Sequence, residues 1–318
     1  MSRVYEALQK SQGEPASASP LVPDQSEMGA VATAVAGTPV MAAEAPAQSL
    51  SVPPDRVLHP VPTPEQRLVA LSDPDGRGAE MFRVLATRLA HMQNKRNLHK
   101  LLITSSVMDE GKSVVAVNLA VTLAHRPDTR VLLIEADLRR PTAGALLSSS
   151  SLRGISEWSD GKLALENSLF QVRDLPLWFL PAGRPMTEPL PLLESGRFAK
   201  MLEAVSAGFD WVLLDATPML PMADSTSLAR LCDGVLVVVR DGITRKKVLN
   251  KAVASIERSK LLGLVFNQAT TLNIDYESYY GANGNKSGKD STKESKKLAK
   301  QAKKEAQKEA DQVKAASA

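Results

Sequence analysis

The chain has few of the residues that build covalent or metal-based scaffolds. Cys232 is the only cysteine among 318 residues, so a disulfide framework is excluded. No apolar run reaches the ~18 residues that a membrane-spanning helix needs. The N-terminal stretch MSRVYEALQKSQ lacks the apolar centre of a secretory signal. The histidines, which are scattered without metal-ligand spacing, are His59, His91, His99 and His125. We therefore expect a cytoplasmic protein without a structural metal.

The basic character of the chain is concentrated at its C-terminal end. The net charge is +4, and much of it comes from KESKKLAKQAKKEAQKEADQVKAASA. Such a segment is either a solvated arm or helix, or a surface attracted to anionic lipid headgroups. Its glutamates and its lack of aromatic residues argue against a nucleic-acid partner. The membrane alternative predicts a peripheral contact through residues 282–318.

The most informative motif is the loop that ends in Gly111-Lys112-Ser113. It follows the apolar run 101–103 and precedes an apolar helix pattern over 113–125, the order that a phosphate-binding P-loop requires. In such a loop the backbone N–H groups and the helix dipole attract phosphates, the lysine reaches the β- and γ-phosphates, and the serine hydroxyl binds Mg²⁺. The motif therefore predicts a nucleoside triphosphate with magnesium. Its candidate contacts are Ser106, which replaces the usual opening glycine, and Asp109, Glu110, Gly111, Lys112, Ser113 and Val114.

Acidic residues follow two further apolar runs. Glu135 and Asp137 come after the run 131–134, and Asp215 comes after 211–214. In an open parallel sheet, ligands bind at the carboxyl ends of the strands, so these carboxylates are expected to meet near the P-loop. We predict that Lys112, Glu135, Asp137 and Asp215 form the catalytic group. The expected metal ligands are Ser113, Asp137 and Asp215.

Apolar strands alternate with helices between residues 77 and 272. This pattern predicts an α/β fold of the P-loop NTPase class, with a mostly parallel, doubly wound sheet covered by helices on both faces. The expected strands are 100–105, 130–136, 177–181, 211–215, 234–239 and 261–266, and the expected helices are 79–92, 113–125, 141–147, 191–206, 223–231 and 245–258. The expected organisation is a short helix in 1–11, an Ala/Pro-rich disordered linker in 12–76, the P-loop domain in 77–272, a tyrosine cluster in 273–281 and the Lys-rich tail in 282–318.

Together these motifs resemble the bacterial tyrosine autokinases of capsular and exopolysaccharide synthesis, in the subgroup without a fused membrane anchor. The resemblance is carried by Thr104-Ser105-Ser106 with Glu110-Gly111-Lys112-Ser113, by Glu135-Ala136-Asp137-Leu138-Arg139-Arg140-Pro141 and by Asp215-Ala216-Thr217-Pro218. Ala182-Gly183-Arg184-Pro185 and the stretch 233–240 are also similar. The likeness covers about residues 79 to 280.

The resemblance implies ATP- and Mg²⁺-dependent phosphorylation of tyrosines on a neighbouring copy. It also implies that Glu135 or Asp137 orients or deprotonates the tyrosine hydroxyl, and that Asn267 contacts adenine. The expected acceptors are Tyr276, Tyr279 and Tyr280, three of the 4 tyrosines in the chain. A membrane-embedded protein that determines polysaccharide chain length is the expected activating partner. The protein would then work in the cytoplasm, peripheral to the inner face of the plasma membrane.

The chain departs from the family pattern at three places. Glu135 stands where the family has aspartate, which moves the carboxylate one methylene further from the backbone. The family's ring-assembly motif, E-x-x-R-x-x-R, is matched by Glu80 and Arg83, but Ala86 replaces its second arginine. The tyrosine cluster is also sparse, with only Tyr276, Tyr279 and Tyr280. These departures leave open a degenerate ATP-binding regulator of polysaccharide export without kinase activity. A septum-placement or plasmid-partition ATPase is the other alternative, but Val107 occupies the position of its additional lysine.

Overall fold

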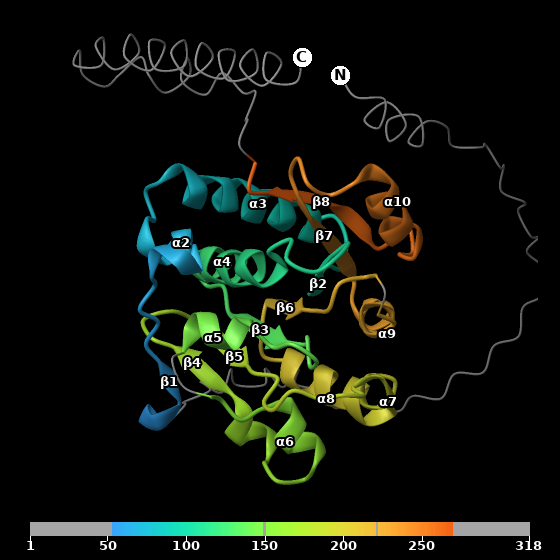
Figure 1. The fold of residues 1–318 in the computed structure, drawn as a ribbon. Coiled ribbons are helices and arrows are strands. Elements are labelled where there is room, and N and C mark those ends of the chain that lie inside the picture. Colours follow the sequence, from blue (N-terminus) through green and yellow to red (C-terminus); the bar gives the residue numbers. More distant parts are fainter. Residues whose placement is uncertain (1–52, 149–150, 221, 270–318) are drawn as a thin grey trace, which may run out of the picture. The chain divides into compact units, whose positions relative to one another are not determined.

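The computed structural model of the protein describes residues 53–148, 151–220 and 222–269 (Figure 1). Its strands are β1 (Val57–Leu58), β2 (Lys100–Ser105), β3 (Val131–Glu135), β4 (Phe170–Val172), β5 (Leu177–Leu180), β6 (Trp211–Asp215), β7 (Gly234–Arg240) and β8 (Leu261–Asn267). Its α-helices are α2 (Val69–Ser72), α3 (Arg77–Gln93), α4 (Lys112–Ala124), α5 (Ala143–Leu147), α6 (Ile155–Ser159), α7 (Leu190–Leu193), α8 (Gly196–Ser206), α9 (Asp224–Leu231) and α10 (Lys246–Ala254). Short 3₁₀ turns are η1 (Pro54–Arg56), η2 (Pro64–Gln66) and η3 (Leu165–Ser168). Within these ranges no helix is long and apolar enough to cross a membrane.

The strands form one 8-stranded sheet in the order β1-β4-β5-β3-β6-β2-β7-β8. Neighbouring strands are parallel except for β4 and β5, which pair antiparallel. In this register Glu135 at the end of β3 lies opposite Asp215 at the end of β6, and Asp215 lies opposite Ile103 of β2. The predicted mostly parallel α/β sheet of the P-loop NTPase class is confirmed. This topology places the P-loop and the acidic residues together at the carboxyl ends of the parallel strands.

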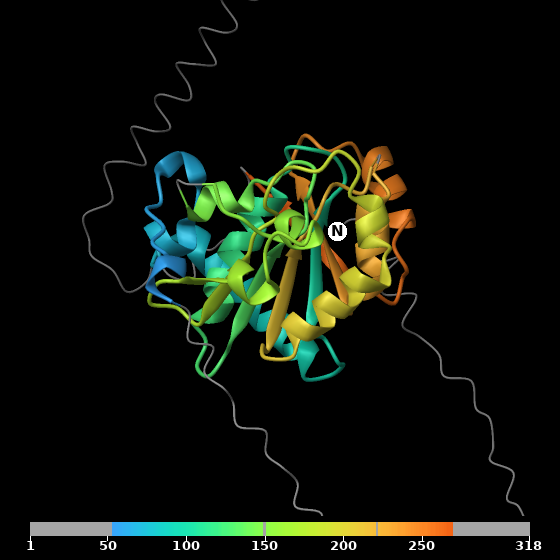
Figure 2. The same cartoon turned by 90° about the horizontal axis from the view of Figure 1, so that it is seen from below.

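Helices cover both faces of the sheet because the central strands bury both sets of side chains. Leu101 and Ile103 of β2 pack in a core with α3, α4 and α5, whereas Leu102 between them packs in a second core with α8, α9 and α10. In Figure 2 the teal helices lie on one side of the strands and the yellow and orange helices on the other. Helix α4 is buried almost all round because α2, α3, α5 and the sheet surround it.

Most predicted elements are present, with differences at their ends and in short segments. The helix predicted over 191–206 is two helices, because the chain turns after α7 and Ser195 begins α8. The Ser195 hydroxyl caps α8 by accepting from the N–H of Phe198 at 3.2 Å. The predicted helix 245–258 ends earlier, since α10 stops at Ala254. The pattern missed β1, β4 and α6, which are too short to show a period.

Residues 53–76, which the composition placed in a disordered linker, are instead packed against the domain. β1 pairs with β4, and Leu58 and Leu68 are buried in the core that contains α4. The side chain of Asn118 on α4 accepts from the N–H of Ala70 at 2.9 Å and donates to the carbonyl of Arg67 at 3.0 Å. The linker prediction is therefore wrong for this part. The composition averaged over this segment did not reveal the few apolar residues that pack against the domain in the folded chain.

Candidate functional site

The P-loop occupies the turn between β2 and α4. Gly111, the N-cap residue of α4, has φ 86°, a left-handed conformation that favours glycine. A Cβ at Gly111 would lie 2.1 Å from the side-chain nitrogen of Asn267, so a larger residue there would displace the Asn267 side chain from the loop. Asp109 likewise has a positive φ of 63°. The loop thus begins α4 with Lys112 as its first residue and leaves the first N–H groups of the helix available for an anion.

Glu110 supports the loop from within. Its carboxylate is buried and accepts from the N–H groups of Ser106 at 2.6 Å and Val107 at 3.0 Å. The hydroxyl of Thr244, in the loop between β7 and α10, donates to the other oxygen of this carboxylate. Asn267 at the end of β8 donates its side-chain N–H to the carbonyl of Glu110 at 2.9 Å. Two distant segments therefore brace the P-loop, and the sequence pattern contained no signal for either contact.

Lys112 lies between the acidic strand ends. Its Nζ is 2.8 Å from Oδ2 of Asp137 and 3.8 Å from Oδ1 of Asp215. Burial alone would lower the pKa of Lys112, but the charges of Asp215 and Asp137 outweigh it, so the pKa is raised. The lysine is thus held in its charged form at the first residue of α4.

Asp215 has the features expected of a metal ligand. It is fully buried, and neither of its carboxylate oxygens has a hydrogen-bond partner among the described residues. Burial raises the pKa of Asp215, and the charge of Lys112 and the hydroxyl of Ser113 only partly oppose this. The contact with Lys112 Nζ, at 3.8 Å, is longer than a hydrogen bond, and a buried carboxylate without hydrogen bonds is costly. The carboxylate and hydroxyl oxygens here suit Mg²⁺, which is hard and prefers oxygen ligands.

No group of three or more His, Cys, Asp or Glu residues within 53–148, 151–220 and 222–269 could hold a metal without other ligands. A magnesium ion would therefore need the Ser113 hydroxyl and oxygen atoms of a bound ligand, as P-loop sites use. The Ser113 hydroxyl accepts from Thr142 Oγ1 at 2.7 Å and from Lys112 Nζ at 3.2 Å. Thr142 was not among the predicted site residues.

The three carboxylates at the strand ends differ in orientation. Asp137 faces Lys112 with one oxygen and accepts the N–H of Arg140 at 3.0 Å with the other. Glu135 instead accepts the N–H of Gly144 at 2.9 Å and the N–H of Ala182 at 3.1 Å, and it is 2% exposed. Burial raises the pKa of Glu135, although these N–H groups oppose the change. Of the two candidates for the tyrosine hydroxyl, Asp137 alone lines the cavity described below.

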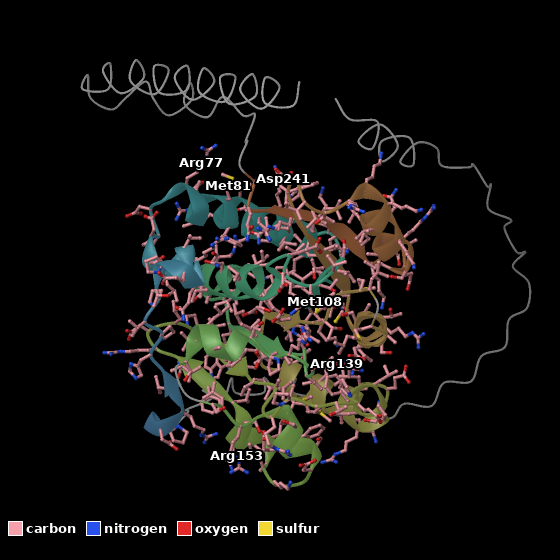
Figure 3. All side chains as sticks on the ribbon, in the orientation of Figure 1. Arg77, Met81, Met108, Arg139, Arg153 and Asp241 are labelled. Carbon is pink, nitrogen blue, oxygen red and sulfur yellow. The ribbon has the colours of Figure 1, made fainter. Side chains whose placement is uncertain are left out.

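A cavity of about 360 Å³ opens beside the P-loop. Asp109, Gly111, Lys112, Ser113, Val114 and Asp137, all predicted from the sequence, line it together with the apolar side chains of Leu146, Leu220 and Met222. Met108 and Arg139, labelled in Figure 3, also line it. Arg139 is fixed by Asp224, which accepts from its Nε at 2.6 Å and its Nη2 at 3.3 Å. Arg140 lies exposed at the same cavity.

Several predicted residues do not line this cavity. Ser106, Glu110, Glu135 and Asp215 are buried and are not among the residues that line it. Asn267 contacts the P-loop as described, which leaves its predicted contact with adenine untested. Tyr276, Tyr279 and Tyr280 lie outside the described residues, as do the segments 1–11 and 282–318.

Comparison with known proteins places this site in a family. No protein-family model matches the chain. The tyrosine-protein kinase YwqD of Bacillus subtilis is 30% identical over 223 residues, which are 70% of this chain and 94% of that protein. The chain belongs to the bacterial tyrosine kinase family. A second relative, the succinoglycan biosynthesis transport protein ExoP of Rhizobium meliloti, is 30% identical to the chain over 212 residues, which are 64% of this chain and 27% of ExoP.

The solved structures agree with this assignment. The kinase domain of the Escherichia coli tyrosine kinase ETK has a TM-score of 0.59 to this chain at 28% identity, covering 64% of this chain and 82% of that one. The family and fold expected from the P-loop and the acidic strand ends are thereby confirmed. The roles of individual residues stay predictions.

Proposed function

We propose that the protein is an ATP- and Mg²⁺-dependent tyrosine autokinase that regulates the polymerisation and export of an exopolysaccharide or capsule. One observation carries this proposal most directly. The P-loop lysine, Lys112, meets Asp137 and Asp215 at 2.8 and 3.8 Å beside an open cavity. Phosphoryl transfer asks the protein mainly for positioning and for stabilisation of charge, and this cluster offers both.

Each residue of the cluster has a distinct role in the proposal. Lys112 and the loop N–H groups hold the phosphates, while Ser113 and Asp215 hold the magnesium ion. When bound, that ion neutralises charge on the phosphates. Asp137, on the cavity wall, orients or deprotonates the hydroxyl of the acceptor tyrosine, whose ordinary pKa of about 10 makes such help useful.

The acceptors and partners follow from the family. The proposed acceptors are Tyr276, Tyr279 and Tyr280 of a neighbouring copy. A membrane-embedded chain-length-determining protein is the proposed activator, which fits the name of ExoP, a succinoglycan biosynthesis transport protein. The kinase would act at the inner face of the plasma membrane, with peripheral contact through residues 282–318. Ring assembly is not part of the proposal, because Ala86, which replaces the second arginine of the motif, is buried, and Glu80 and Arg83 pair with each other at 2.6 Å.

A second candidate is an ATP-binding regulator that does not phosphorylate protein. It is favoured by the position of Glu135, whose carboxylate oxygens both accept backbone N–H groups and are turned from the cavity. Such a protein would retain nucleotide binding through Lys112 and Ser113. Only the chemistry on tyrosine would be absent.

Incubation of the purified full-length protein with ATP and Mg²⁺, followed by phosphotyrosine mapping, tests the proposal. Wild type is expected to carry phosphate on the 273–281 cluster, and Lys112→Met is expected to carry none. A variant with all three tyrosines of the cluster replaced by Phe serves as the acceptor control. Calorimetric titration with ADP and Mg²⁺ shows whether a protein that carries no phosphotyrosine still binds nucleotide. Wild type that binds ADP but carries no more phosphate than Lys112→Met would establish the regulator instead.

A further inference from the structure

Glu135 at the end of β3 has a role different from that of the neighbouring carboxylates. Its two oxygens accept the N–H of Gly144, in the first turn of α5, and the N–H of Ala182, after β5. It therefore joins two segments that are far apart in sequence. An aspartate, one methylene shorter, would not reach both from the same backbone position. The close approach also uses Gly144, where an added Cβ would lie 3.3 Å from Glu135 Oε2.

The contact with Gly144 replaces the usual capping of α5. Thr142 is the N-cap residue of this helix, and a threonine there normally accepts the N–H of the second or third helical residue. In this protein its side chain makes no capping hydrogen bond. Gly144 is the second residue of α5, and its N–H donates to Glu135 instead.

The freed hydroxyl of Thr142 is used at the P-loop. Thr142 Oγ1 donates to Ser113 Oγ at 2.7 Å. A hydroxyl oxygen has two acceptor sites and one proton. Thr142 uses one acceptor site of Ser113, and Lys112 Nζ, at 3.2 Å, uses the other. In the proposed complex Lys112 binds the phosphates, and the electron pair that it leaves is offered to the cation. The hydrogen bond restricts the rotation of the Ser113 side chain. The contacts thus run from Glu135 through the first turn of α5 to the serine that P-loops use for magnesium.

We propose that Glu135 is a positioning residue: by capping α5 in place of Thr142 it directs the Thr142 hydroxyl to Ser113 and so prepares the serine for magnesium. This inference rests on the proposed nucleotide and magnesium site but not on tyrosine transfer. It assigns a role to Thr142, which no sequence motif singled out, and it gives a physical reason for glutamate at a position where the family resemblance implies aspartate.

The test measures how much Mg²⁺ the full-length protein needs to bind ADP. Glu135→Asp and Thr142→Val are each expected to raise the Mg²⁺ concentration for half-maximal ADP binding about five-fold, the value of one hydrogen bond. Binding of ADP in EDTA is expected to stay unchanged. Both residues act on Ser113 through the same hydrogen bond. The double variant should therefore need no more Mg²⁺ than the single variant with the higher Mg²⁺ requirement. Thr122→Val is the matched control, since it removes a buried hydroxyl at the other end of α4.

Three results would overturn the inference. Additive effects, about 25-fold in the double variant, would show independent roles. An unchanged Mg²⁺ requirement in Glu135→Asp with reduced phosphotyrosine formation would make Glu135 a directly catalytic group. An unchanged Mg²⁺ requirement in Thr142→Val would show that the Thr142 hydroxyl does not prepare Ser113. If thermal unfolding shows that Glu135→Asp does not fold, Thr142→Val alone tests the inference.

The same measurements distinguish this inference from the proposed function. Wild type that binds ADP with Mg²⁺ but forms no phosphotyrosine refutes the kinase and leaves the positioning role intact. An active kinase whose Mg²⁺ requirement is the same in both variants refutes the positioning role alone.

Discussion

At the scale of single residues, identical chemical groups at the strand ends have different surroundings and therefore different uses. Asp137 pairs with Lys112, Glu135 caps backbone N–H groups, and Asp215 has no hydrogen-bond partner among the described residues. A buried carboxylate without hydrogen bonds costs stability in the absence of its ligand. Such a cost at a functional site is compensated elsewhere in the fold.

Asp215→Asn is expected to stabilise the protein in EDTA by about 1–2 kcal/mol, the order of an unsatisfied buried group. Burial raises the pKa of Asp215 despite the charge of Lys112, so the ionised form is less stable inside the protein than in water. With the folded-state pKa above the unfolded value, this residue lowers stability progressively as pH rises from about 4. The gain in Asp215→Asn should therefore be larger at pH 7.5 than at pH 5. Urea unfolding at the two pH values measures it.

Asp174→Asn is the control for this prediction, because Asp174 is exposed and should show little change at either pH. The same Asp215→Asn protein is expected to bind ADP more weakly than wild type when Mg²⁺ is present. A variant less stable than wild type at both pH values would contradict the argument that the ionised carboxylate is the unfavourable group.

At the scale of elements, short helices are held by side chains from elsewhere in the sequence. Glu157 in the first turn of α6 accepts the N–H of Gly154 at 2.8 Å and the Nε of Arg184 at 3.2 Å. Gly183 beside it has φ 81°, and a Cβ there would lie 2.1 Å from Glu157 Oε2. The Ala182-Gly183-Arg184-Pro185 stretch, which carried part of the family resemblance, thus fixes α6 to the loop after β5.

Glu157→Gln is expected to lower the free energy of unfolding by about 1–2 kcal/mol at pH 7, as for hydrogen bonds to a charged group. Burial alone would raise the pKa of Glu157, but the N–H of Gly154 and the charge of Arg184 outweigh it and lower the pKa. A lowered folded-state pKa means that the stabilisation is complete above the ordinary glutamate value of about 4.3 and is lost as pH falls below it. Urea unfolding should show a smaller difference in the free energy of unfolding between wild type and Glu157→Gln at pH 3.5 than at pH 7. Glu166→Gln, at an exposed position, should show none at either pH.

Long elements could be predicted from the sequence and short contacts could not. β2, α4, β3 and β6 carry apolar runs long enough to show their period, and the spacing of Lys112, Asp137 and Asp215 placed the site. β1 and α6 are too short for any period, and the break before α8 depends on Ser195 as a cap. The partners of Glu110 and Glu135 come from residues such as Thr244 and Ala182, which lie far along the chain. Only the folded sheet brings these residues together.

At the scale of the whole molecule, the sheet is widened beyond its P-loop core by β1 and β4. These strands lie at one edge of the sheet, next to β5, and the residues that lead into α3 pass over α4. The predicted kinase domain of 77–272 therefore omits a part of the folded unit. That part supplies buried side chains and covers a sheet edge, and an uncovered edge strand is a site for unwanted pairing.

Removal of residues 1–76 is expected to destabilise the protein far more than removal of residues 1–52. The longer deletion takes away Leu58 and Leu68, and full burial of each leucine contributes about 1.5–3 kcal/mol. It also leaves the Asn118 side chain without its partners at Ala70 and Arg67, a further cost for a buried amide. The comparison of thermal unfolding between the two truncated proteins isolates residues 53–76. Equal Tm values would show that these residues are dispensable for stability, whereas a loss that Asn118→Leu partly restores in the shorter protein would identify the unpaired amide as one of its causes.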